Sequence, residues 1–216
     1  LNEVIKTIYE FVYDYFCDWY IEFTKTRFYG NDKEDKKIAE SVSIYVLKNI
    51  LKLLHPFTPH ITEEIWGYLE IKNQKFIINS EMSIFDKQLI NKNIEDEMSM
   101  IINSISAIRN IKASLNIPPS KTINLYVRGP EKETNLIEKN ITLLNRLAKI
   151  DSIKAGPDIK KPNQSATAIM KNIELFVPLK DLIDLNQEIA RLEKQIEDMN
   201  GRLNAINKKL DNQNFV

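Results

Sequence analysis

The sequence predicts a mainly α-helical protein, with a helical bundle followed by a small α/β unit and one long coiled-coil helix. Only five glycines occur among 216 residues, and long stretches place apolar side chains at steps of three and four, as one face of an α-helix requires. The region 116–180 also contains stretches that alternate apolar and polar residues with period two, as strands do. The last segment repeats apolar residues in a 3-4-3-4 pattern, which is typical of a coiled coil.

The first helix is predicted over roughly residues 1–25, where a broad apolar stripe runs from Val4 to Phe23. Such a wide stripe favours a helix that packs on more than one side. Cys17 lies among aromatic residues of this stripe, so we expect it to be buried and unreactive. A charged turn over 30–37 then leads into a second helix over roughly 38–54.

The stretch HPFTPHITEEIW, residues 55–66, contains both histidines, two prolines and two adjacent glutamates. Because the residue before a proline avoids the α region, we expect His55 and Thr58 to be non-helical. Thr58 is then a suitable N-cap, and Pro59 a suitable first residue, for a new helix that ends near Leu69. The stretch therefore predicts a sharp corner between two helices.

Two chemical alternatives for this corner are weaker than the structural one. His55 and His60 stand five positions apart across two prolines with no cysteine nearby, which is a poor pattern for a metal site. Glu63 and Glu64 are adjacent, so they face different directions on a helix and are poorly placed for acid–base catalysis. We expect the positive end of the helix dipole to explain both acids, and Trp66 to lie in the core.

Residues 71–88 show no regular pattern, and a third long helix is predicted from about 89 to 115. The stretch NIPPSK ends this helix, because two consecutive prolines cannot continue it. The alternating stretch TINLYVRG predicts a strand, and a helix near 131–149 and the short strand DSIKAG follow. A hairpin turning at Lys171 and Asn172 completes a βαββ unit.

The last segment has an apolar stripe, here named the heptad seam, with alternating steps of three and four residues. Its members are Leu182, Leu185, Ile189, Leu192, Ile196, Met199, Leu203, Ile206 and Leu210. A seam this narrow needs a partner helix, because burying each large apolar side chain stabilises by about 1.5–3 kcal/mol. Self-association through residues 182–210 is therefore one expectation.

The composition limits the chemistry. Lys and Arg total 30 and so do Asp and Glu, so the formal net charge is zero, which argues against a strongly basic coat but not against a local basic strip. One cysteine excludes an intrachain disulfide and a zinc cluster of several thiolates. The single cysteine fits a reducing, cytoplasmic location. No run of 18 apolar residues occurs, so we expect no membrane partner. Because Leu1 opens inside an apolar pattern, we expect a piece of a longer protein.

Several stretches resemble the C-terminal third of the valyl-tRNA synthetase family, in the same order along the chain. FCDWYIE resembles that family's anticodon-binding helix, and LLHPFTPHITEEIW resembles a motif shared by the valyl, isoleucyl and leucyl enzymes, which usually have Met and Phe in place of Thr58 and His60. IRNIKASLNIPPSK resembles the following helix and turn, with Lys112 where Arg is common. ELFVPLKDLIDLNQEIARLEKQI and KLDNQNFV resemble the entry to the coiled-coil arm of the valyl enzyme.

The resemblance implies a class I synthetase anticodon-binding helical bundle over 1–115, a small α/β subdomain over 116–180 and the first helix of a tRNA-binding arm over 181–216. It implies tRNA(Val) as the partner, and ATP-dependent aminoacylation with valine as the activity of the parent enzyme. The parent's catalytic domain uses ATP and Mg, and its His-x-Gly-His element and Lys-Met-Ser-Lys-Ser loop are absent from this sequence. We therefore expect no cofactor, no metal and no catalytic residue in this chain, and no aminoacylation by it alone.

The candidate tRNA-binding residues are basic side chains in two places. Arg109 and Lys112 stand one helical turn apart and Lys121 follows the break, where the resemblance implies contact near the anticodon stem-loop. On the last helix, the basic residues off the heptad seam are Arg191, Lys194, Arg202, Lys208 and Lys209. The resemblance implies that these contact phosphates at the outer corner of the tRNA, whereas on an ordinary coiled coil they would only aid solubility.

Two other functions stay open at this point. One is a non-enzymatic coiled-coil module that dimerises or assembles without binding RNA. The other is the equivalent region of an isoleucyl or leucyl enzyme, although isoleucyl enzymes commonly end in a cysteine-rich zinc module and this chain has one cysteine.

Overall fold

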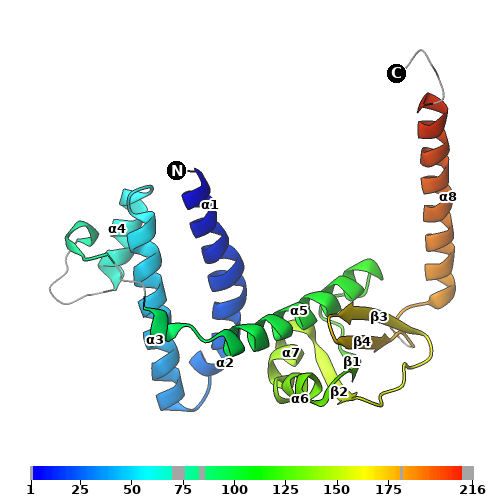
Figure 1. Ribbon diagram of the computed structural model, residues 1–216, viewed down its shortest axis with the longest axis horizontal. Coiled ribbons are helices and arrows are strands. Elements are labelled where there is room, and N and C mark those ends of the chain that lie inside the picture. The colour runs from blue at the N-terminus through cyan, green and yellow to red at the C-terminus, as the bar shows by residue number, and fades with distance from the viewer. Residues whose placement is uncertain (1, 70–75, 83–85, 181, 211–216) are drawn as a thin grey trace. The chain divides into compact units, whose positions relative to one another are not determined.

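The structure is a computed structural model that describes residues 2–69, 76–82, 86–180 and 182–210. Its contacts divide the chain into two compact units, Leu1–Lys92 (unit 1) and Asn93–Val216 (unit 2). Helices dominate, together with one four-stranded sheet and a long last helix, so the predicted fold class is confirmed (Figure 1). The finer division at 115/116 and 180/181 stays a prediction. No helix among the described residues is long and apolar enough to cross a membrane.

Unit 1 is built from helices. In chain order they are α1 (Asn2–Glu10), the π-helix η1 (Phe11–Ile21), α2 (Glu22–Phe28), α3 (Lys33–Leu54), α4 (Pro59–Tyr68) and the 3₁₀ helices η2 (Ile77–Asn79) and η3 (Lys87–Leu89). The first three form one continuous helical stretch over residues 2–28, which agrees with the predicted first helix over its described residues 2–25. Residues 71–75 and 83–85, part of the region expected to be irregular, lie outside the described residues.

The core of unit 1 gathers around Trp66, which is 2% exposed and packs with Leu51 of α3 and Ile77 of η2. The prediction that Trp66 is a core residue is therefore confirmed. The prediction that Cys17 is buried is wrong, because Cys17 is exposed. It lies in η1, where hydrogen bonds from i to i+5 widen each turn, so steps of three and four no longer follow a single face.

The corner between α3 and α4 differs from the prediction at His55. This residue is the C-cap of α3 and keeps helical angles, φ −54° and ψ −41°, although a proline follows, and its N–H donates to the Leu51 carbonyl at 2.9 Å. Its ring Nδ1 lies 2.8 Å from Thr62 Oγ1 of α4, a hydrogen bond that ties the two helices together. Thr58 is non-helical and Pro59 begins α4 as expected, but the Thr58 side chain makes no cap bond.

The two glutamates of α4 make structural contacts. Neither lies in the first turn, so the helix dipole is not their main explanation. The Glu63 carboxylate accepts from the N–H of Ile77 at 3.0 and 3.2 Å, which fixes η2 against α4. Glu64 accepts from the Tyr68 hydroxyl at 3.2 Å.

Unit 2 is a small α/β structure followed by a long helix. In chain order its elements are α5 (Lys92–Ser114), β1 (Ile123–Arg128), α6 (Glu131–Lys139), α7 (Ile141–Ala148), β2 (Ile150–Gly156), β3 (Ser165–Met170), β4 (Ile173–Pro178) and α8 (Leu185–Leu210). The single helix expected near 131–149 is two helices that meet at Asn140. The predicted strands and the hairpin at Lys171 and Asn172 are confirmed.

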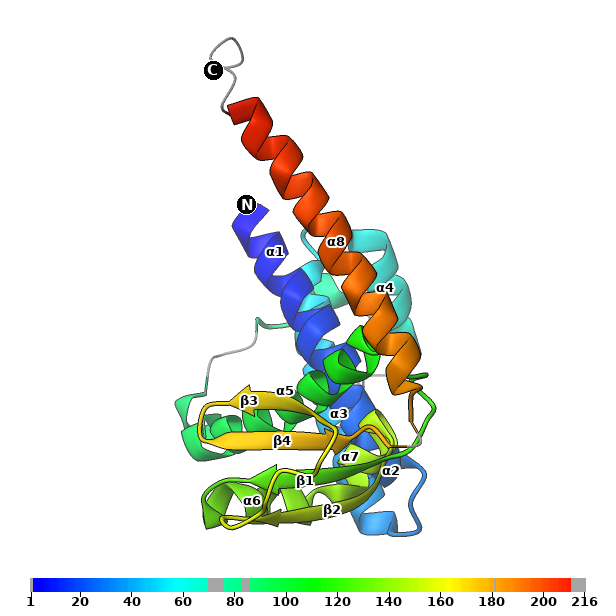
Figure 2. The same ribbon diagram turned by 90° about the vertical axis from the view of Figure 1, so that its right-hand side faces the viewer.

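The sheet has the strand order β2-β1-β4-β3, with β1 and β2 parallel and the other pairs antiparallel. Helices α5, α6 and α7 lie on one face of it (Figure 2). The alternation predicted for β1 is observed, because Ile123, Leu125 and Val127 are buried. They share the core with Ile101, Ile105 and Ile108 of α5, with Ile137 and Leu144 of α6 and α7, and with Leu175 and Val177 of β4.

A bidentate ion pair joins α2 to α3 in unit 1. Arg27 Nε lies 2.8 and 3.0 Å from the two carboxylate oxygens of Asp35, and Arg27 Nη2 lies 2.6 Å from Oδ1. This hydrogen bonding holds the pKa of Asp35 below its ordinary value of 3.8. Asp35 therefore adds stability above that value and loses it as the pH falls through the lowered pKa.

We predict that Asp35→Asn is less stable than the wild-type chain at neutral pH, and that the difference disappears in acid below the lowered pKa. Urea denaturation at a series of pH values measures this. Glu34→Gln, next along the same helix, is the control and should leave the pH dependence in this range unchanged. A constant difference between wild type and Asp35→Asn at every pH would contradict the prediction.

Candidate nucleic-acid interface

The C-terminus of α5 is fixed by a Schellman motif. The N–H of Asn116 donates to the Ala113 carbonyl at 3.2 Å, and the N–H of Ile117 donates to the Lys112 carbonyl at 2.8 Å. Asn116 has φ 53°, a left-handed conformation that asparagine tolerates better than most residues, and Ile117 is buried. Two prolines follow and prevent further helix, so the chain leaves α5 in one defined direction.

The C-terminus of α7 lies against α5 and uses its basic side chains. The last carbonyls of a helix have no partner within the helix and carry the negative end of its dipole. Arg109 Nε donates to the Leu147 carbonyl at 3.0 Å, and Lys112 Nζ donates to the Ala148 carbonyl at 2.8 Å. Both basic residues therefore cap α7, a structural function that the sequence pattern does not reveal.

Lys112 is a buried lysine, only 3% exposed. Besides Ala148, its Nζ donates to the carbonyls of Lys121 at 2.6 Å and Pro119 at 3.4 Å, so its three donors are used. Burial, and then the neighbouring charge of Lys149, lower the pKa of Lys112 below its ordinary value. Lys112 is one of the candidate phosphate contacts, and in this structure its ammonium group is buried and holds three carbonyls together.

A cleft of about 780 Å³, the basic cleft, lies between the end of α5, the turn after it and the end of α7. Arg109, Ser120 and Lys149 are exposed residues of its lining, and Lys112 lies beneath them. None of the described residues that line the cleft is acidic. Lys121 is exposed just beyond the lining, so the region around the cleft favours an anion.

The candidates on α8 separate into two kinds. The Arg191 guanidinium pairs with Glu188 and donates from Nη2 to the Ser114 carbonyl at 2.9 Å, so it joins α8 to the end of α5. The other four candidates are exposed, off the heptad seam: Lys194, Arg202, Lys208 and Lys209. Along the seam, seven residues are 43–62% exposed, namely Ile189, Leu192, Ile196, Met199, Leu203, Ile206 and Leu210.

Unit 1 carries an exposed group of aromatic residues that the sequence analysis did not select. Tyr9, Phe11, Tyr13 and Tyr15, the aromatic strip, are 45–62% exposed. Tyr9 and Tyr13 stack with ring centroids 4.3 Å apart, and Phe11 and Tyr15 are 6.5 Å apart. Tyr9 lies in α1, and the other three rings lie in the π-helix η1. Exposed rings of this kind are suited to stacking on unpaired bases.

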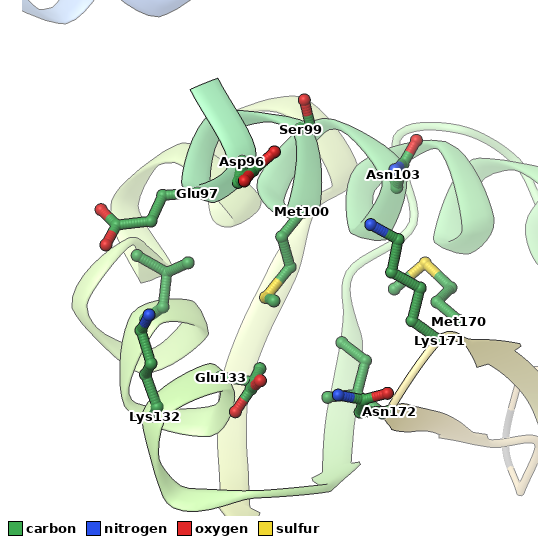
Figure 3. A pocket seen from close by; sticks show the side chains of 12 residues that line it. Asp96, Glu97, Ser99, Met100, Asn103, Lys132, Glu133, Met170, Lys171 and Asn172 are labelled. Atoms are coloured by element: carbon green, nitrogen blue, oxygen red, sulfur yellow. The ribbon is translucent and has the colours of Figure 1, made fainter. Parts of the chain in front are cut away.

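A second pocket of about 320 Å³ lies in unit 2, between α5, α6 and the β3–β4 turn (Figure 3). The acidic residues Asp96, Glu97 and Glu133 line it together with Lys132 and Lys171. Because both signs of charge are present, this pocket does not favour a polyanion as the basic cleft does. Among the described residues, no group of three or more His, Cys, Asp or Glu side chains could hold a metal ion.

Comparison with known proteins identifies relatives of the chain. Residues 1–127 match the family described as "Anticodon-binding domain of tRNA ligase". The chain is 38% identical to a valine–tRNA ligase of Listeria innocua serovar 6a over 217 aligned residues, covering 100% of the chain and 24% of that relative. It is 37% identical to a valine–tRNA ligase of Geobacillus stearothermophilus, covering 98% and 24%, and 34% identical to one of Bacillus subtilis strain 168, covering 100% and 24%. The chain thus spans about a quarter of the length of these relatives.

We predict that Lys112→Met lowers the free energy of unfolding by about 1–3 kcal/mol, because methionine keeps the side-chain length but leaves buried carbonyls without donors. Urea denaturation measures this. The exposed Lys160→Met is the control and should change stability little, and Lys112→Arg, which keeps donors at this position, should be less destabilised than Lys112→Met. Equal stability of Lys112→Met and Lys160→Met would contradict the structural function of Lys112.

Proposed function

Because the chain belongs to the family of anticodon-binding domains of tRNA ligases, we propose that it is the tRNA-binding region of a valine–tRNA ligase and binds tRNA(Val). The observation that carries the proposal is the family match over residues 1–127. The similarity of the whole chain to valine–tRNA ligases supports the choice of valine.

The two units offer complementary chemistry for such a partner. Anticodon bases are unpaired, so a protein can stack on them and read their edges, and the aromatic strip of unit 1 has the side chains for stacking. Unit 2 offers cations for phosphates. Among the candidate tRNA contacts that the sequence predicts, the exposed basic residues are Arg109, Lys121, Lys194, Arg202, Lys208 and Lys209.

In the parent enzyme this region would contribute to catalysis by orientation. Holding the tRNA far from the reacting atoms places its acceptor end in the catalytic domain, where ATP and Mg support the transfer of valine. The chain contains neither the His-x-Gly-His element nor the Lys-Met-Ser-Lys-Ser loop expected of that domain. The proposed function is thus binding and positioning, in the cytoplasm where translation occurs, without aminoacylation by this chain alone.

We predict that the chain binds a tRNA(Val) transcript with an affinity that falls as salt rises. The triple variant Arg202→Gln, Lys208→Gln, Lys209→Gln should lower the log–log salt slope by up to about 0.9 for each lost phosphate contact. Fluorescence anisotropy over a salt series measures this. The matched control neutralises three acidic residues of the same helix, Glu193→Gln, Glu197→Gln and Asp198→Asn, and should not lower the slope. Absence of tRNA binding by the wild-type chain would overturn the proposed function.

A second candidate function, self-association, is favoured by the exposed heptad seam. Seven large apolar side chains in a 3-4 pattern form a surface that suits helix-on-helix packing, and mixed charges flank it. An isolated helix of this kind is marginal unless one face is packed. We therefore propose that the seam pairs with a second copy of itself when the chain is studied alone. The two functions are separable, because seam pairing alone would give no salt-dependent binding of tRNA.

We predict that Ile196→Asp combined with Leu203→Asp makes the chain monomeric, because burying two added charges in a helix pair is costly. Sedimentation velocity at several concentrations measures the oligomeric state. The control Gln195→Asp with Asn204→Asp adds the same charge to α8 outside the seam and should leave the wild-type state unchanged. A monomeric wild-type chain at high concentration would refute seam pairing.

A further inference from the structure

Three basic residues, Arg109, Lys112 and Lys149, lie in the lining of the basic cleft. Arg109 and Lys149 are exposed on its walls, Lys112 is buried beneath, and no acidic side chain lines it among the described residues. The charge of Lys149 is close enough to contribute to the lowered pKa of Lys112. An anion in the cleft would relieve this repulsion.

Lys149 occupies an unfavourable backbone conformation for its residue type. It ends α7 with φ 56°, and its N–H donates to the Asn145 carbonyl at 2.8 Å, which is the helix-ending geometry that glycine adopts most easily. Its side chain has no hydrogen-bond or ion-pair partner among the described residues. The lysine side chain therefore makes no contact that stabilises the fold, but its charge could bind an anion in the cleft.

The walls of the cleft are held in place before any ligand binds. Lys112 Nζ joins the carbonyls of Pro119, Lys121 and Ala148, so the turn after α5 and the end of α7 form one rigid frame. Lys112 is thus a positioning residue: it fixes the frame from which Arg109 and Lys149 face the cleft. A preformed site loses less conformational entropy on binding.

From these observations we propose that the basic cleft binds a phosphodiester group of the RNA backbone. Lys149 makes the principal contact with the phosphate, and Arg109 lies beside it. The proposal rests on the proposed function and assigns Lys149 a contact that the sequence pattern does not reveal. A cleft of about 780 Å³ exceeds the size of one phosphate, so it has room for the sugars on either side. Lys121 is exposed just beyond the lining, so it extends the positive region in a direction that a bound RNA strand could follow.

The test uses Lys149→Gly, which removes the charge and suits the left-handed backbone. Anisotropy with the tRNA(Val) transcript over a salt series should show a log–log slope lower by about 0.7–0.9 and affinity weaker by about five- to tenfold near 0.1 M salt. Lys149→Arg should retain the wild-type slope. Urea denaturation should show Lys149→Gly at least as stable as the wild-type chain, because glycine relieves the positive φ.

The matched control is Lys171→Gly. Lys171 is also an exposed lysine with positive φ, 43°, but it lines the pocket that contains Asp96, Glu97 and Glu133. Its replacement changes the net charge equally and should leave the slope unchanged. Equal log–log salt slopes for Lys149→Gly and Lys171→Gly would overturn the proposal. Either both variants would lower the slope, as a change in net charge would do, or neither would.

Two further results would also overturn it. Inorganic phosphate that binds in a Lys149-dependent way, with an unchanged tRNA slope in Lys149→Gly, would identify a free-anion site instead of a backbone contact. A wild-type chain that does not bind tRNA would overturn the proposed function and this proposal together. By contrast, wild-type binding with an unchanged slope in Lys149→Gly would remove this proposal alone.

Discussion

The ammonium group of Lys112 is the interaction on which the arrangement of unit 2 depends. A charge buried to 3% exposure persists only when its donors are satisfied, and here three carbonyls from two segments satisfy them. Those segments are the turn after α5 and the end of α7, so one group fixes where β1 and β2 begin. The bond from the N–H of Ile123 to the Lys149 carbonyl at 3.0 Å then links the first residue of β1 to the residue that precedes β2.

The same constraint explains why basic residues gather there, and which of them remain for a ligand. Helix C-termini present unpaired carbonyls, and cations satisfy them well. Lys112 and Arg109 donate to carbonyls at the end of α7, and Arg191 donates to a carbonyl at the end of α5. A basic cluster at this place therefore first indicates capping and only then RNA binding. The cleft is nevertheless positive as a whole, and Lys149, whose side chain has no partner among the described residues, is the lining residue that ends α7.

Local patterns predicted most of the fold, and the failures have two physical causes, contacts between residues far apart in the chain and a π-helix that the sequence does not signal. The alternation of β1, the hairpin at Lys171 and the burial of Trp66 depend on near neighbours or on hydrophobicity, which sequence displays directly. The contacts of Lys112 with Ala148 and of Arg191 with Ser114 join residues 36 and 77 positions apart through backbone carbonyls, which every residue has. The exposure of Cys17 could not be predicted because no sequence signal marked the π-helix.

The two units contribute differently to binding under the proposed function. Contacts between cations and phosphates release counterions, so their contribution falls as salt rises. Stacking of unpaired bases on aromatic rings involves no counterion and depends on which bases are unpaired. The aromatic strip lies in unit 1 and the basic cleft lies in unit 2. Base stacking and phosphate binding would therefore come from different units of the chain. Selection among tRNAs would then rest on unit 1, while unit 2 raises affinity for any RNA backbone that reaches it.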